Sequence, residues 1–155
     1  MTLRTQPAAP QCREVMVVDD DADVRCALVE YLSAEGISSF QAVDGLEALE
    51  RVQSGSTPCA IVLDVDMPRL SGPALVTALR ADSTLPRIPV LTMTAGAAPP
   101  GVDADGHLAK PFAPESMLAA LFRVCRSCAA CDREGPLIGS IFASRQRADL
   151  SGKPA

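Results

Sequence analysis

An apolar run that ends on an acid is the feature that most constrains how this chain folds. Residues 60–63 are Ala-Ile-Val-Leu, the run ends at Asp64, and the turn-forming residues Pro68 and Gly72 follow. Short apolar runs bounded by such residues are typical of strands buried on both faces of a parallel sheet. Because open α/β sheets carry their binding sites at the carboxyl ends of the strands, Asp64 is the first candidate for a functional residue.

Other short apolar runs repeat this pattern along the chain. Helical stretches separate them, and the runs lie at residues 14–18, 37–43, 60–64, 90–93 and 107–109. Strands that alternate with helices predict an α/β fold with a five-stranded parallel sheet covered on both faces. One connection differs, because the segment 95–101 is rich in Pro and Gly and predicts a loop or a very short helix.

Two acids are predicted to cap the first two helices. Asp21 precedes the first helical stretch, and Asp44 precedes the second, where Glu47 stands three residues later as in a capping box. In the second stretch, the helical spacing of Leu46, Leu49 and Val52 predicts that these side chains share one face.

The composition excludes several classes of protein. With 155 residues, 48% of them hydrophobic and 21% charged, the chain has the size of one globular domain. Its formal net charge of −5 argues against a protein that binds a nucleic-acid backbone, so we expect no direct DNA binding. The longest apolar run, residues 117–122, is too short to cross a bilayer, and residues 1–10 lack the apolar centre of a signal peptide. We therefore expect a cytoplasmic protein without a membrane segment.

The predicted domain occupies residues 13–128. Residues 1–12, which include Pro7 and Pro10, predict a flexible N-terminal arm. Residues 129–155 predict a C-terminal tail that is too short to bury a core of its own.

Of the six cysteines, Cys12 lies in the predicted arm and the other five form two groups. Cys26 and Cys59 fall inside predicted core elements, where a reduced thiol acts as a small hydrophobe. Cys125, Cys128 and Cys131 have the spacing of metal ligands but no evident fourth ligand. We interpret Cys125 as a core thiol and the other two as incidental neighbours.

Chemically reactive side chains follow the predicted strands at the point where each strand ends. They are Asp19, Asp20, Asp64, Thr94 and Lys110. If the strands are parallel neighbours, these groups meet at one edge of the sheet. Clustered carboxylates attract a hard cation such as Mg²⁺, while a hydroxyl and an ammonium can hold phosphoryl oxygens. A carboxylate beside the metal can act as a nucleophile and form an aspartyl phosphate.

The order and separation of these motifs resemble the receiver domain of bacterial two-component response regulators. The likeness is carried by VVDD at 17–20, LDxxMPxxxG at 63–72, TA at 94–95 and KPF at 110–112. The resemblance implies a flavodoxin-like, doubly wound sheet with strand order 2-1-3-4-5. It also implies a phosphoacceptor signalling protein of a phosphorelay, not a multiple-turnover enzyme, whose donor is a sensor histidine kinase or histidine phosphotransfer protein. Its downstream protein target is unknown.

The resemblance assigns a role to each metal-site residue. Asp64 would be the phosphoacceptor, and Asp19 and Asp20 would join it in holding Mg²⁺. Asp66 would give its backbone carbonyl to the same ion.

Three further positions are assigned by the resemblance as well. Thr94 would be the switch hydroxyl, and Lys110 would contact the phosphoryl group. The bond between Lys110 and Pro111 is often cis in this family.

The chain departs from the family pattern in three places. His107 stands where a switch aromatic is usual, although its ring could still move. The segment 95–109 is short, so we expect the fourth helix to be short or missing. Finally, the side chain of Asp66 adds a carboxylate, which we hypothesise influences the lifetime of the phosphoryl group.

Two other functions remain open at this point. Asp64 and Asp66 have the spacing of the nucleophile and general acid of haloacid-dehalogenase-like phosphatases, although Pro68 stands where those enzymes carry Thr or Ser. The second open function is that of a receiver-like module that binds its partner without phosphorylation. Strand-end acids such as Asp20 and Asp21 also commonly serve only as helix caps.

Overall fold

Strands and helices alternate along residues 14–125, the part of the chain that this computed structural model describes. The predicted arm and tail, with the tail's apolar residues 137–142, lie outside these residues. The elements are β1 (Glu14–Val18), α1 (Ala22–Ala34), β2 (Ser38–Ala42), α2 (Gly45–Gln53), β3 (Ala60–Asp64), α3 (Gly72–Ala81), β4 (Val90–Thr94), β5 (Gly106–Ala109) and α4 (Pro114–Cys125).

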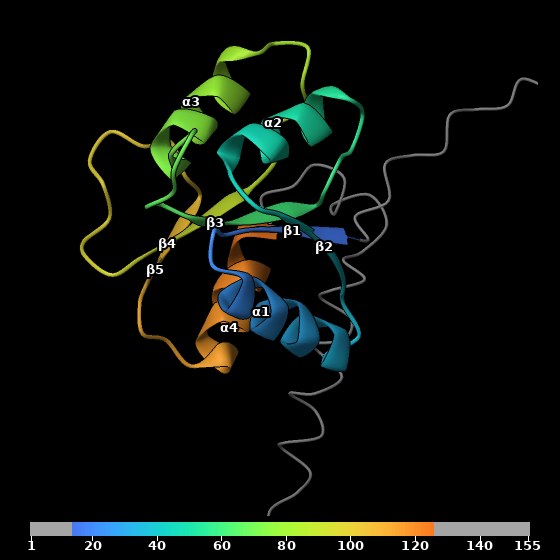
Figure 1. Ribbon diagram of the computed structural model, residues 1–155, viewed down its shortest axis with the longest axis vertical. Coiled ribbons are helices and arrows are strands. Elements are labelled where there is room, and N and C mark those ends of the chain that lie inside the picture. Colours follow the sequence, from blue (N-terminus) through green and yellow to red (C-terminus); the bar gives the residue numbers. More distant parts are fainter. Residues whose placement is uncertain (1–13, 126–155) are drawn as a thin grey trace, which may run out of the picture.

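The five strands form one parallel sheet in the order β2-β1-β3-β4-β5, as predicted. Helices α1 and α4 cover one face of the sheet, and α2 and α3 cover the other (Figure 1). The apolar residues of β3 are buried on both faces, which explains why the run at residues 60–63 lacks polar alternation. The sheet is therefore doubly wound, with one apolar cluster on each side.

Side-chain caps fix where the first helices begin. The backbone N–H of Asp23 donates to Asp21 Oδ1 at 2.9 Å, and that of Glu47 donates to Asp44 Oδ1 at 2.9 Å. Glu47 in turn accepts a hydrogen bond from the backbone N–H of Val43 at 2.8 Å. Both predicted caps are confirmed, and an N-cap of this kind contributes about 1 kcal/mol.

The segment between β4 and β5 contains no helix, which confirms the prediction for residues 95–109. Two arginines and two acids hold it against α3 instead. Arg80 Nη2 lies 2.9 Å from Asp105 Oδ2, and Arg87 lies 3.2 Å from Asp103 and 3.1 Å from Asp105. The backbone N–H of Val90 also donates to Asp105 Oδ2 at 2.8 Å. These contacts tie the start of β5 to the start of β4.

Two predictions about the core are wrong. Cys26 is exposed, because it lies two residues before the buried Leu28 and so about 200° around the helix from it. Leu46, predicted to share a face with Val52, is 36% exposed while Val52 is buried, because six residues place the two side chains about 120° apart around the helix.

The remaining cysteine predictions divide by location. Cys59 and Cys125 are buried, as predicted. Cys128 and Cys131 lie outside the described residues, so their interpretation stays a prediction. Within residues 14–125, no helix combines the length and the apolar character that a membrane crossing requires.

Candidate functional site

The carboxyl edge of the sheet gathers the reactive side chains predicted from the sequence. Val18, the last residue of β1, pairs with Leu63 of β3, so Asp19 and Asp64 follow on neighbouring strands. Thr94, the last residue of β4, pairs with Ala109 of β5, directly before Lys110. Because all pairings are parallel, these strand ends meet at one place.

Three carboxylates form the centre of the site. One oxygen from each of Asp19, Asp20 and Asp64 lies within 4.8 Å of the others. Asp19 is 1% exposed and Asp64 6% exposed, whereas Asp20 is open to solvent. Negative charges this close and partly buried repel one another unless a cation lies among them. The donors are all oxygens, which suits Mg²⁺ and gives no preference to softer metals.

Lys110 contributes the positive charge at this site. Its Nζ lies 3.4 Å from Asp19 Oδ2 and 3.5 Å from Asp64 Oδ1. Its backbone N–H donates to the carbonyl of Thr94 at 2.7 Å, which fixes the residue against the end of β4. The bond between Lys110 and Pro111 is cis, as expected.

The surroundings change the acidity of the nucleophile candidate. Burial raises the pKa of the Asp64 carboxyl, the charge of Asp19 raises it further, and Lys110 acts against both. For Lys110, burial disfavours the ammonium, but Asp19 and Asp64 outweigh that effect and raise its pKa. Without a cation, Asp64 therefore keeps its proton to a higher pH than an ordinary aspartate.

Backbone and side-chain donors hold the acidic turn after β1. The N–H of Asp21 donates to Asp19 Oδ1 at 2.9 Å. Arg25 Nη1 donates to the carbonyl of Asp19 at 2.6 Å, and its Nε donates to Gln41 Oε1 on β2 at 3.2 Å. Arg25 was not predicted from the sequence as a residue of the site. Its only signal there is its position, because a basic residue near the start of a helix stands at the end that disfavours positive charge.

Asp66 and Thr94 border the acidic cluster. The N–H of Asp66 donates to Asp64 Oδ1 at 3.3 Å, while the Asp66 side chain is exposed. The Thr94 hydroxyl is buried and accepts a hydrogen bond from the N–H of Gly96 at 3.3 Å. The carboxylate of Asp66 is not among the three whose oxygens lie within 4.8 Å of one another.

The structure does not bring His107 into the acidic cluster. Its Nδ1 lies 3.0 Å from the hydroxyl of Thr92 on the neighbouring strand. Its Nε2 is buried and has no hydrogen-bond partner among the described residues. The ring is thus linked to β4 and not to the carboxylates.

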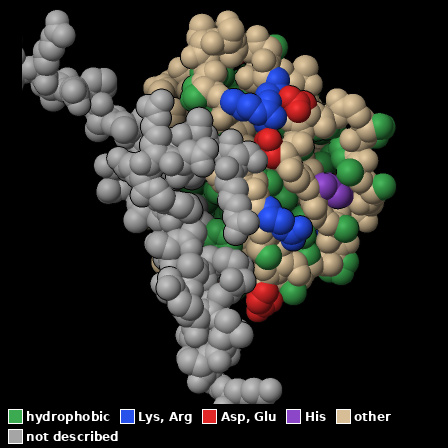
Figure 2. All heavy atoms as spheres, turned by 180° about the vertical axis from the view of Figure 1, so that it is seen from behind, with side chains coloured by type: hydrophobic (Ala, Val, Ile, Leu, Met, Phe, Trp, Pro, Cys, Tyr) green, Lys and Arg blue, Asp and Glu red, His purple; other side chains and the backbone are tan. Residues whose placement is uncertain are grey.

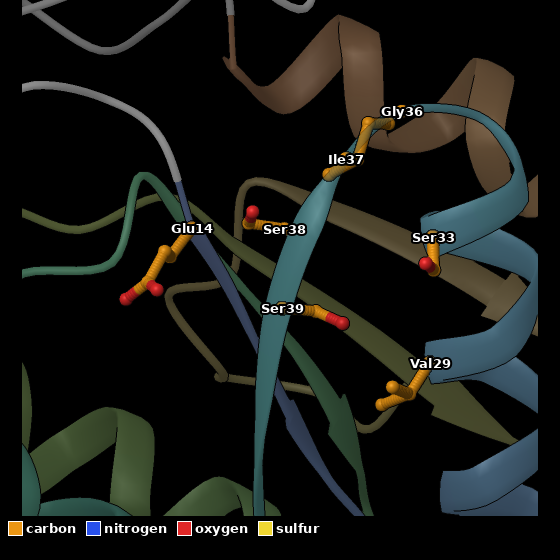
Figure 3. A pocket seen from close by; sticks show the side chains of 7 residues that line it. All are labelled: Glu14, Val29, Ser33, Gly36, Ile37, Ser38 and Ser39. Carbon is orange, nitrogen blue, oxygen red and sulfur yellow. The ribbon is translucent and has the colours of Figure 1, made fainter.

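A cavity among the described residues lies away from the acidic cluster. This cavity of about 450 Å³ lies beside β2, lined by Glu14, Val29, Ser33, Gly36, Ile37, Ser38 and Ser39 (Figure 3). Because Glu14 and Ser38 begin their strands, this cavity lies at the end of the sheet opposite the acidic cluster. On the face shown in Figure 2, basic side chains of the described residues form no continuous patch.

A family model described as the response regulator receiver domain matches residues 15–122. The chain belongs to the receiver domain family. This receiver domain is 40% identical over 146 residues to a response regulator MprA of Mycolicibacterium vanbaalenii, and 43% identical over 118 residues to one of Mycobacterium avium. The matches cover 90% and 72% of this chain but only 60% and 50% of those relatives, so the chain spans little more than half their length.

Solved structures share the flavodoxin-like fold of this receiver domain. The chemotaxis response regulator CheY4 of Vibrio cholerae superposes with a TM-score of 0.67 at 34% identity, covering 74% of this chain and 99% of that one. The receiver domain of the sensor histidine kinase PA1611 of Pseudomonas aeruginosa gives 0.68 at 23% identity, covering 75% and 99%. The second likeness, at that identity, concerns the fold alone.

Proposed function

We propose that this receiver domain accepts a phosphoryl group on Asp64 from a phosphohistidine, with Mg²⁺ as cofactor. The observation that carries the proposal is the meeting of Asp19, Asp20 and Asp64, with oxygens within 4.8 Å, and Lys110 at 3.5 Å from Asp64. A helix cap or a turn residue needs no such convergence. The family match supports a role in signalling by phosphorylation.

The donor set fits Mg²⁺. The carboxylates of Asp19, Asp20 and Asp64 would hold the ion, and the backbone carbonyl of Asp66 would add a fourth protein oxygen. The structure of the PA1611 receiver domain, which shares the fold of this chain, is described with a magnesium ion in its own active-site cleft. When bound, the ion neutralises the carboxylates and the phosphoryl oxygens, so that two negative groups can approach each other.

Asp64 then acts as the nucleophile. One carboxylate oxygen forms a bond to phosphorus while the P–N bond of the phosphohistidine breaks, and the departing imidazole nitrogen keeps the electron pair of that bond and takes up a proton from water. Lys110 and the hydroxyl of Thr94 hold the phosphoryl oxygens. Only the ionised carboxylate attacks, so a cation that acts against the raised pKa of Asp64 would favour this step.

Signal output follows as a population shift in the cytoplasm. The phosphoryl group favours the conformation in which Thr94 and Lys110 contact it. The donor is a sensor histidine kinase or a histidine phosphotransfer protein, and the receiver of the signal is a downstream protein of unidentified type.

Labelling with acetyl phosphate and Mg²⁺ tests the proposal. We expect wild type to form one hydroxylamine-sensitive aspartyl phosphate, Asp64→Asn to form none, and the control Asp23→Asn, an exposed acid outside the cluster, to behave as wild type. Multiple turnover of a phosphoester would indicate a phosphatase. Absence of any reaction in wild type would favour a module that binds without phosphorylation.

A further inference from the structure

The loop between β3 and α3 contains a strained residue. Arg69 has φ of 69°, and it is the one residue other than glycine with positive φ among residues 14–125. This conformation is unfavourable for a side chain with a Cβ, and glycine adopts it without strain. Such strain persists where the surroundings determine the backbone, and it concentrates at functional sites.

An ion pair holds Arg69 in this conformation. Its Nε lies 3.2 Å from Asp44 Oδ2, and the Asp44 side chain is 6% exposed while that of Arg69 is 60% exposed. The other carboxylate oxygen of Asp44 caps α2 through the N–H of Glu47. Because ion pairs with an exposed partner add little to stability, overall stability alone does not explain an arginine here.

Close backbone contacts hold the loop between β3 and α3 at two further points. A Cβ on Gly45, at the start of α2, would overlap the carbonyl oxygen of Leu70. A Cβ on Gly72, at the start of α3, would lie 2.7 Å from the carbonyl oxygen of Asp64. The loop therefore rests on α2 on one side and on the end of β3 on the other.

Asp66 lies on the part of the loop between these contacts. Its N–H donates to Asp64 Oδ1 at 3.3 Å, so a shift of the loop moves both the Asp66 carbonyl and a hydrogen bond of Asp64. We propose that Arg69, held by Asp44, is a positioning residue that sets the place of the Asp66 carbonyl for Mg²⁺. This inference rests on the proposed function, because it requires the metal site.

Three variants separate positioning from a purely structural role. Arg69→Gly removes the strain and the ion pair, Asp44→Asn removes the charge of the pair but keeps an oxygen for the cap, and Arg51→Gln is the control. Arg51 is 43% exposed and pairs with Glu47 at 2.9 Å, but it does not belong to the loop. Calorimetric titration with MgCl₂ gives the affinity, and thermal unfolding without Mg²⁺ gives the stability.

We expect the dissociation constant for Mg²⁺ to rise about tenfold in Arg69→Gly and Asp44→Asn, the low end of the effect of outer contacts on metal ligands. The control should bind as wild type. The melting temperature of Arg69→Gly without Mg²⁺ reports the balance between the strain relieved at position 69 and the loss of a partner by the buried Asp44.

The outcomes distinguish this inference from the proposed function. Unchanged or tighter Mg²⁺ binding in Arg69→Gly or Asp44→Asn, with wild type binding the ion, overturns the positioning role and leaves the proposed function intact. A lower melting temperature of Arg69→Gly with unchanged affinity assigns the pair to stability alone. Absence of Mg²⁺ binding in wild type overturns both.

Discussion

Lys110 Nζ lies 3.5 Å from Asp64 Oδ1 although Lys110 follows β5 and Asp64 ends β3, two strands that β4 separates in the sheet. The lysine side chain spans the end of the intervening strand, which finishes at Thr94. One cation thus balances two buried carboxylates, those of Asp19 and Asp64, and leaves room for a further positive charge among the three acids.

Removal of that cation should make the apo domain less stable. In Lys110→Met the aliphatic stem remains but the two buried carboxylates lose their counterion, so we expect the free energy of unfolding to fall by about 1 kcal/mol without Mg²⁺. Saturating Mg²⁺ should recover most of the loss. Urea unfolding with and without the ion measures both values, with Arg123→Met, an exposed position on α4, as control. Equal stability of Lys110→Met and wild type in the apo state would contradict the account.

The raised pKa of Asp64 predicts a dependence of stability on pH. Above the ordinary carboxyl pKa of 3.8 the unfolded chain has lost this proton while the folded chain still binds it. The stability contributed by this group is therefore full at low pH and is lost as pH rises through the folded-state pKa.

Asp64→Asn removes this group and should be more stable than wild type at about pH 7 without Mg²⁺. The difference should shrink as the pH approaches 3.8 and should also shrink when Mg²⁺ is added. Urea unfolding of both proteins across this range measures it. A difference that stays constant with pH would show that ionisation of Asp64 is not its source.

Asp66 should influence the lifetime of the phosphoryl group. Its exposed carboxylate can take a proton from an attacking water, so Asp66→Asn should lose phosphate more slowly, by roughly two- to tenfold. This change in rate is well below the roughly 10²–10⁴-fold acceleration that a fully positioned general base provides. Release of phosphate after removal of acetyl phosphate gives the rate, and equal rates in the two proteins would dismiss the hypothesis.

The two arginines that hold the segment between β4 and β5, Arg80 and Arg87, should differ sharply in their contribution to stability. Arg80 is 13% exposed and contacts Asp105, which is 12% exposed. It also donates to the backbone carbonyls of Ile88 and Asp103. Arg80→Ala removes this largely buried guanidinium and all of these contacts, so it should reduce the free energy of unfolding by about 3 kcal/mol, although Asp105 keeps Arg87. Arg87 is 56% exposed, and Arg87→Ala should lower stability by less than about 1 kcal/mol. Chemical denaturation ranks the two, and similar losses in both variants would mean that burial of the pair has no special importance.

The sequence predicts the sheet well because its strands are buried on both faces. Such strands appear as uninterrupted apolar runs, and the parallel topology then brings Asp19, Asp64 and Lys110 to one edge without knowledge of any contact. Loss of the helix between β4 and β5 was also predictable, since Pro and Gly are poor helix formers.

The contacts that hold the site could not be predicted in this way. Arg25, Arg69 and Arg80 each reach a partner on another element through a long, flexible side chain, and no periodicity specifies that partner. Cys26 and Leu46 were misplaced because apolar character alone does not decide on which face of a helix a residue lies, and both residues are exposed.

Borohydride trapping tests the central claim most directly. After incubation with acetyl phosphate and Mg²⁺, reduction converts an aspartyl phosphate to homoserine, and peptide mass spectrometry locates the modified residue. We expect homoserine at position 64 and at no other acid of the cluster. Modification at Asp19, Asp20 or Asp66 with Asp64 intact would contradict it.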